Sequence, residues 1–193
     1  MPLSGPRHRR VRPGRSNDQE RHVSSSSPTH ADLITTRLIL RPWTALDVTA
    51  VLDATQAAHW AKDFPADGDR VIASLFEQHP AWLGIHGHRL IIECESGLVV
   101  GSIGLFWPPN DGVLEIGYGV VASRRGRGYA TEATRALAEF ALTAPEVHTV
   151  SANVELSNPA SVRVLEKAGF HRWPSEENTQ NTARFGMTSP RQA

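Results

Sequence analysis

Residues 114–133 read LEIGYGVVASRRGRGYATEA, and this stretch indicates both the fold and the chemistry of the chain. Its first half has the pattern of a β-strand, and its second half has the apolar spacing of an amphipathic helix. Between them, Gly126 and Gly128 place no Cβ between the main chain and a ligand. Consecutive N–H groups can therefore turn toward one anion at the start of the helix, as in a pyrophosphate site.

Three arginines accompany the two glycines. Arg124, Arg125 and Arg127 are consistent with a ligand that bears several phosphates. The same residues are compatible with a tight strand-to-helix turn whose arginines are solvated. A dinucleotide-binding fingerprint is disfavoured because Thr131 stands where Gly or Ala is needed, and the Gly-Lys-Ser/Thr ending of a Walker loop is absent.

The hydrophobic pattern outside this stretch predicts an α+β domain. Strand-like segments occur at 33–41, 89–95, 98–107, 113–122, 147–155, 170–173 and 183–188, and helical segments at 44–58, 70–78, 129–143 and 159–168. Thr44 and Asp47 form a capping-box pattern, and Asn158 followed by Pro is a preferred helix start. The order combines an antiparallel meander with a strand, helix, strand crossover.

Charge and composition divide the chain into two parts. Residues 1–30 hold six arginines against Asp18 and Glu20 with almost no apolar residues, which predicts a disordered extension of charge +4. Because the whole chain has a net charge of zero, residues 31–193, the single predicted domain, carry −4. This acidic balance argues against nucleic acid as the main ligand, and no apolar run is long enough for a membrane span.

Cysteine and histidine content gives no sign of a metal site. Cys94 is the single cysteine, and His86 and His88 lie close together without further ligands nearby. We therefore expect no metal. A lone cysteine and a tail without the apolar core of a secretory signal predict a cytoplasmic location.

Three ordered segments resemble the GNAT superfamily of acetyl-coenzyme A dependent N-acetyltransferases. They are EIGYGV at 115–120, RGRGYATEA at 125–133 and NPASVRVLEKAGF at 158–170, and together with TRLILR at 36–41 they are most similar to the ribosomal-protein N-terminal alanine acetyltransferase branch. The resemblance implies a mixed, mostly antiparallel central sheet of about seven strands flanked by about four helices. It also implies acetyl-coenzyme A (acetyl-CoA) as co-substrate. We expect a monomer or homodimer, although the sequence does not determine the oligomeric state.

The resemblance further implies a set of cofactor-binding residues. They are Val120, Val121, Arg124, Arg125, Gly126, Arg127, Gly128, Tyr129, Ala130, Asn158 and Ser161. Two positions depart from the family pattern: Ser123 replaces a Gln or Arg, and Leu165 replaces a tyrosine that acts as general acid in many members. The first change should weaken one cofactor contact, and the second leaves the acid to another group.

Acetyl transfer to an amine needs a proton acceptor, because an alkylammonium ion with a pKa of about 10 cannot attack a thioester. Glu115 is the candidate base, and its alternative is a solvated strand residue or ion-pair partner. We expect a main-chain N–H near Val120 or Val121 to bind the thioester oxygen. For the departing thiolate the resemblance implies Ser161 as proton donor; water is an equal alternative, since a thiol pKa of about 8.5 makes the step undemanding.

The acceptor side is expected in the loop between the first two helices. Trp60 and Phe64, together with Glu115, are the candidate substrate-binding residues, and the alternative is that both rings are tucked into the core. Cys94 is interpreted as a core residue of a strand and not as an acyl carrier. This interpretation predicts direct transfer in a ternary complex.

The leading hypothesis is therefore an N-acetyltransferase that moves an acetyl group to a primary amine, either a protein N-terminus or a small molecule. A second hypothesis is a catalytically weak acyl-CoA binding or sensor module, for which Leu165 leaves room and against which Glu115 and Ser161 argue. A third, a dinucleotide-binding oxidoreductase, predicts NADH binding.

Overall fold

The computed structural model describes residues 32–174 and 181–188, and the predicted extension at 1–30 lies outside them. The strands are β1 Leu33–Ile34, β2 Leu38–Pro42, β3 His88–Glu93, β4 Val99–Leu105, β5 Val113–Val120, β6 Thr149–Glu155, β7 His171–Arg172 and β8 Thr182–Thr188. The helices are α1 Ala45–Leu52, α2 Asp67–Leu75, α3 Tyr129–Ala141 and α4 Pro159–Ala168, with short 3-10 helices at Pro80–Leu83 and Ala122–Arg124.

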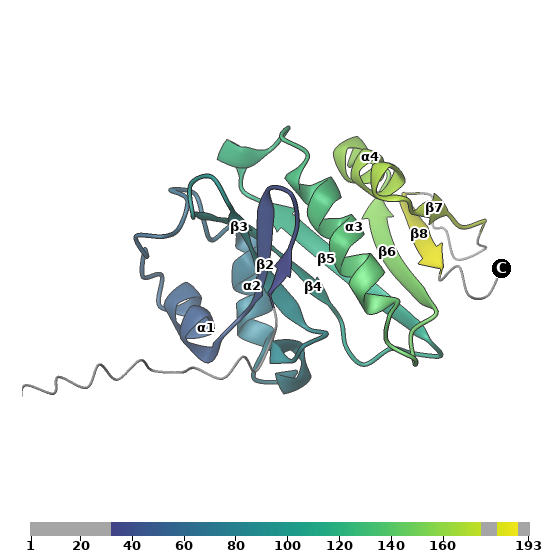
Figure 1. The fold of residues 1–193 in the computed structure, drawn as a ribbon, viewed down its shortest axis with the longest axis horizontal. Helices are drawn as coiled ribbons and strands as arrows, with labels where there is room; N and C mark the ends of the chain where they lie inside the picture. The colour runs from purple at the N-terminus through teal and green to yellow at the C-terminus, as the bar shows by residue number, and fades with distance from the viewer. Residues whose placement is uncertain (1–31, 175–180, 189–193) are drawn as a thin grey trace, which may run out of the picture.

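The strands form one sheet in the order β1-β2-β3-β4-β5-β6-β8-β7. Every neighbouring pair is antiparallel except β5 and β6, which are parallel. Helices α3 and α4 lie side by side in front of the sheet in Figure 1, and α2 lies behind it. The predicted mixed, mostly antiparallel α+β fold is confirmed.

The first predicted strand is in fact a hairpin, which raises the number of strands among the described residues to eight. Thr35 N–H donates to the carbonyl of Leu38 at 2.9 Å, and the Leu38 N–H donates back to the Thr35 hydroxyl oxygen at 3.0 Å. These bonds turn the chain between β1 and β2. A pattern of alternating residues does not reveal such a turn, because both arms of a hairpin alternate.

Capping side chains set where the helices begin. Thr44 and Asp47 form the predicted capping box of α1, and the Asn158 side chain accepts from Ser161 N–H at the start of α4. α2 begins three residues earlier than expected, because the Asp69 carboxylate accepts from the main-chain N–H of Ala66. Local hydrogen bonds of this kind satisfy the unpaired donors of a first turn.

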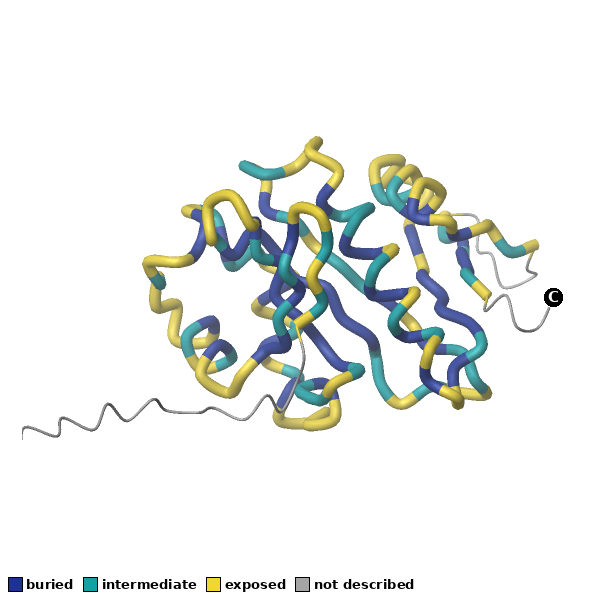
Figure 2. Tube along the Cα trace, viewed as in Figure 1, coloured by how far each residue is buried: buried dark blue, intermediate teal, exposed yellow. Residues whose placement is uncertain are grey.

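The core lies on both faces of the sheet. Figure 2 shows that the central strands and the inward side of α3 are buried. Leu38 and Leu40, expected on one face of β2, are both fully buried, and Leu137 of α3 is as well. Among the described residues, no helix is both long enough and apolar enough to span a membrane.

Candidate functional site

β5 and β6 separate partway along their length. Their parallel pairing runs from Val113 with Thr149 to Glu115 with Ser151 and stops there. Beyond this point β5 pairs with β4, and β6 pairs with β8. The second half of β5 therefore has one open edge that faces the gap between the two strands.

The open edge of β5 presents a main-chain donor to this gap. The Val121 N–H donates to the carbonyl of Val100 at 2.9 Å, so it is engaged in the sheet. Hydrogen bonding alternates between the two sides of an antiparallel strand, which directs the N–H of Val120 away from β4. Of the two positions expected to supply the donor, Val121 is engaged in the sheet, and Val120 is the one whose N–H faces the opening.

A cleft of about 1100 Å³ lies along the open edge. It is bounded by β5, the turn that follows it, α3, α4 and the turn between β1 and β2. The predicted cofactor residues in its lining are Val120, Arg124, Arg125, Gly126, Gly128, Tyr129, Ala130, Asn158 and Ser161. Val121 and Arg127 do not line it.

The turn between β5 and α3 has the backbone of an anion site. Gly126 and Gly128 have φ angles of +77° and +80°, which side-chain-bearing residues rarely adopt. Gly128 is the N-cap of α3 and has no side chain. The first main-chain N–H groups of the helix therefore receive no capping hydrogen bond from the N-cap residue. A Cβ built on Gly126 would meet no atom within 4 Å, which shows that this position faces open space.

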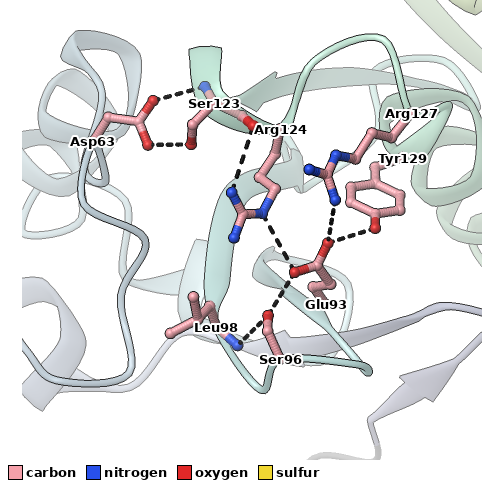
Figure 3. A network of polar contacts seen from close by, with 8 residues as sticks. All are labelled: Asp63, Glu93, Ser96, Leu98, Ser123, Arg124, Arg127 and Tyr129. Atoms are coloured by element: carbon pink, nitrogen blue, oxygen red, sulfur yellow. Dashed lines mark hydrogen bonds and ion pairs between the residues drawn. The ribbon is translucent and has the colours of Figure 1, made fainter.

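The buried carboxylate of Glu93 binds side chains of the turn between β5 and α3 (Figure 3). Glu93, at the end of β3, lies 3.3 Å from Nε of Arg124 and 3.4 Å from Nη1 of Arg127. It also accepts 2.5 Å hydrogen bonds from the hydroxyls of Tyr129 and Ser96. The bonds from Ser96, Tyr129 and Arg124 hold the pKa of Glu93 below its ordinary value.

These contacts give two of the arginines an internal partner. Arg124 and Arg127 pair with Glu93, although Arg124 also lines the cleft and the Arg127 side chain is 49% exposed. Arg125 is exposed, lines the cleft and is braced by a 3.0 Å bond from its Nε to the carbonyl of Val120. Arg125 is therefore the cation of the turn best placed to meet a phosphate.

Ser123 holds the start of the turn through Asp63 (Figure 3). The Ser123 main-chain N–H and hydroxyl donate to the two carboxylate oxygens of Asp63 at 2.8 and 2.6 Å. The bond from the Ser123 hydroxyl lowers the pKa of Asp63. The departure from the family pattern at Ser123 thus creates an internal contact with the segment between α1 and α2.

The β1–β2 turn closes the other side of the cleft, and sequence reasoning did not place it there. Arg37 donates to Glu132 of α3 at 2.7 Å and to the carbonyl of Arg127 at 2.8 Å. Thr35 also donates to Glu132, at 2.6 Å. Burial alone would raise the pKa of Glu132, but the bonds from Thr35 and Arg37 outweigh it and lower that pKa.

The candidate base lies on the opposite face of the sheet from the cleft. Glu115 is exposed on β5 and accepts a 3.2 Å bond from Nδ2 of Asn153 on β6. Side chains alternate between the two faces of a strand, so Glu115 and the cleft-lining Tyr118 point to opposite sides. Glu115 lies where the pairing of β5 and β6 ends, so its carboxylate flanks the gap.

The N-terminal turn of α4 forms the far wall of the gap. Asn158 caps the helix through Ser161 N–H at 3.1 Å, while both residues also line the cleft. A second cavity of about 160 Å³ lies between β5, β6 and α4, and Tyr118 and Ser161 line both cavities. Leu165, which stands at the position of the family tyrosine, is 1% exposed and lines the second cavity.

The acceptor residues expected in the loop after α1 are part of the core. Trp60 is 5% exposed and Phe64 2% exposed, and their rings pack edge to face with centroids 5.1 Å apart. The burial of both rings favours the alternative interpretation, in which they are tucked into the core. The chain bridges to β4 at this point, with Ala61 N–H donating to Val99, which draws the two rings inward.

Cys94 differs from the expected core residue as well. It is exposed, directly after β3, and it does not line either cavity. Within residues 32–174 and 181–188, no group of three or more His, Cys, Asp or Glu side chains is arranged to hold a metal ion.

Comparisons with known proteins agree with this geometry. The model of the acetyltransferase (GNAT) domain matches residues 37–171. N-acetyltransferase YjdG of Bacillus subtilis, itself uncharacterised, is 34% identical over 82 residues, which are 42% of this chain and 49% of that protein. The chain thus spans about half the length of this curated relative.

Two solved structures share the fold. An acetyltransferase from Agrobacterium tumefaciens superimposes with a TM-score of 0.59 at 23% identity, covering 82% of this chain and 95% of that one. Spermidine N-acetyltransferase from Vibrio cholerae, solved in complex with CoA and spermine, gives 0.57 at 17% identity, covering 80% and 96%. Because the family model spans the cleft, the turn and most of the sheet, the chain belongs to the acetyltransferase (GNAT) domain family.

Proposed function

We propose that this chain transfers the acetyl group of acetyl-CoA directly to a primary amine, either a protein N-terminus or a small-molecule amine. The observation that carries the proposal is the open edge of β5, which runs from the glycine turn to the gap between β5 and β6. A cofactor with phosphates at one end and a thioester at the other fits such a path, since the anion site and the gap lie at its two ends.

The residues along the path fit the parts of acetyl-CoA. The pyrophosphate would be held by N–H groups at Gly126 to Ala130 and by Arg125, and the amide-bearing arm by Asn158. The acetyl carbonyl would meet the N–H of Val120 at the open edge, which stabilises negative charge on its oxygen. The CoA in the V. cholerae relative supports this assignment.

The acceptor would approach from the face that carries Glu115. This carboxylate, held by Asn153, would remove a proton from the incoming ammonium group directly or through water. Direct transfer is favoured because Cys94 lies outside both cavities, so no cysteine within reach of the gap can carry the acetyl group. The spermine in the V. cholerae relative supports an amine acceptor.

Within the family we propose kinship with the ribosomal-protein N-terminal alanine acetyltransferase branch. The support is the segment TRLILR at 36–41, which provides Arg37 and the turn that closes the cleft over α3. A protein N-terminus is the acceptor that this kinship favours.

One observation favours the sensor as a second candidate. Leu165 occupies the position of the family's acid and is buried, so it provides no proton donor. Substitution Glu115→Gln separates the two candidates: a transferase loses turnover and keeps its cofactor affinity, whereas a sensor has no turnover to lose.

Calorimetric titration of acetyl-CoA into the protein tests the proposal. Gly126→Glu places a carboxylate in the anion site, and Gly97→Glu is the matched control because Gly97 also has positive φ and open space at its Cβ but does not line the cleft. Binding by wild type and Gly97→Glu, lost in Gly126→Glu, is expected. Absence of binding by a folded wild type rejects both candidates.

A second experiment identifies the acceptor. The release of free thiol from acetyl-CoA is measured with a panel of amines and of peptides that begin with alanine.

A further inference from the structure

Tyr118 occupies the boundary between the two cavities. It projects from the open half of β5 toward α4, and its hydroxyl donates a 3.2 Å hydrogen bond to the main-chain carbonyl of Ser161. Among the described residues, Tyr118 and Ser161 are the two that line both the large cleft and the small cavity. A thioester that reaches the gap along the open edge of β5 would therefore pass Tyr118.

Tyr118 and Glu115 flank the gap from opposite faces. They are three residues apart on one strand, so their side chains point to opposite sides of the sheet. The Glu115 side is open to an incoming amine, and the Tyr118 side is the cofactor cleft. Glu115, a proton acceptor, thus lies on the side from which the amine would approach, and Tyr118, a proton donor, lies on the side of the departing sulfur.

The Tyr118 hydroxyl is a protonated but weak acid. Burial raises the pKa of Tyr118, so the phenol keeps its proton throughout the neutral range and would release it only as negative charge develops on the sulfur during cleavage of the C–S bond. Its present acceptor is a neutral carbonyl, which a thiolate can replace because charge-assisted hydrogen bonds are the stronger ones. Leu165, the residue at the usual position of the acid, has no proton to give.

We propose that Tyr118 is the catalytic proton donor to the departing sulfur, a role that rests on the proposed acetyltransferase function. As the C–N bond forms and the C–S bond breaks, sulfur takes the electron pair of the C–S bond and the proton of the Tyr118 hydroxyl. The nitrogen that becomes the amide releases one proton to Glu115 or water. Exchange with water then returns one proton to the tyrosinate, so the step balances without another reactant.

The chain offers a direct spectroscopic test, because Tyr118 and Tyr129 are its two tyrosines. Labelling tyrosine with 13C at Cζ gives two NMR signals, which Tyr129→Phe assigns. The Tyr129 hydroxyl is bound to Glu93 below the glycine turn, so its signal reports on the phosphate end of the cleft. The Tyr118 signal reports on the thioester end.

The probes are CoA and desulfo-CoA, which differ only at the sulfur. We expect the Tyr129 signal to move equally with both, and the Tyr118 signal to move with CoA but much less with desulfo-CoA. Equal movement of the Tyr118 signal with both probes overturns its role while leaving the cofactor assignment intact. If neither signal responds and calorimetry shows no binding, the proposed function fails and the role of Tyr118 fails with it.

Steady-state kinetics provide a second test once an acceptor substrate has been identified. Tyr118→Phe removes one hydroxyl and is expected to lower kcat about tenfold or more, with KM for acetyl-CoA changed less than about twofold. Ser161→Ala tests the competing donor on the same boundary. An unchanged kcat in Tyr118→Phe together with a large loss in Ser161→Ala assigns the proton to Ser161 and overturns the proposal.

Discussion

Asp63 accepts two hydrogen bonds from Ser123, at 2.8 Å from the main-chain N–H and at 2.6 Å from the hydroxyl. This contact joins the segment between α1 and α2 to the beginning of the glycine turn. The two residues lie 60 positions apart in the chain, so the two carboxylate oxygens of Asp63 couple distant segments of the domain.

Replacement of Asp63 by Asn should loosen this coupling. The amide keeps one acceptor oxygen and loses the charge, which should cost about 1 kcal/mol of stability and raise KM for acetyl-CoA a fewfold. Urea unfolding and initial rates measure the two effects. Asp67→Asn, an exposed acid at the start of α2, is the control and should behave like wild type. Identical stability and KM in the two variants would show that the Asp63 contact is dispensable.

Glu93→Gln should weaken cofactor binding more than catalysis. The neutral amide cannot balance Arg124 and Arg127, so the turn loses the anchor that fixes its N–H groups. We expect KM for acetyl-CoA to rise about tenfold, with kcat within about twofold of wild type. Steady-state kinetics and calorimetry provide the measurement, with the exposed Glu95→Gln as control. A fall in kcat at unchanged KM would contradict this positioning role.

Glu115→Gln should lower turnover without loss of cofactor affinity. The amide can still bond to Asn153 but cannot accept a proton, so kcat should fall about a hundredfold at neutral pH. Glu155→Gln, an exposed glutamate on β6, is the matched control for the loss of one negative charge. Equal rates for both variants would exclude Glu115 as the base.

Trp60→Ala and Phe64→Ala should destabilise the domain. Both rings are buried, so truncation should cost about 3 to 5 kcal/mol each. Chemical denaturation measures the loss, and Leu46→Ala, at a position 82% exposed, is the control with little effect. Full stability of either variant, with a raised KM for the acceptor, would restore the substrate-binding interpretation.

Acid should destabilise the fold through His88. Burial lowers the pKa of His88 to about 4, from 6.5 for the free side chain. Between these values the unfolded chain binds a proton that the folded chain does not, so stability falls as pH decreases from 6.5 to 4. The full effect is about 3 kcal/mol. His88→Phe keeps a ring against Trp82 and Phe106 and should remove this part of the pH dependence, as measured by unfolding at several pH values. If wild type and His88→Phe lost the same stability between pH 6.5 and pH 4, His88 would not be the cause of the acid sensitivity.

The elements that the sequence predicts well are those whose causes are local. The capping box of Thr44 and Asp47, the start of α4 at Asn158 and the glycine turn all depend on residues within a few positions of one another. The first strand was predicted as one segment and is a hairpin, because its turn is made by Thr35 and Leu38 inside an otherwise alternating pattern.

The α+β fold and the glycine turn follow from the sequence alone, since alternation, helical spacing and glycine conformation are properties of short segments. Only the tertiary structure decided what the side chains around the turn do. Arg124, Arg127 and Tyr129 meet Glu93 more than thirty residues away, and Trp60 and Phe64 enter the core because their segment joins β4. Tyr118 gained its position from α4, which packs across the gap that β5 leaves when it parts from β6.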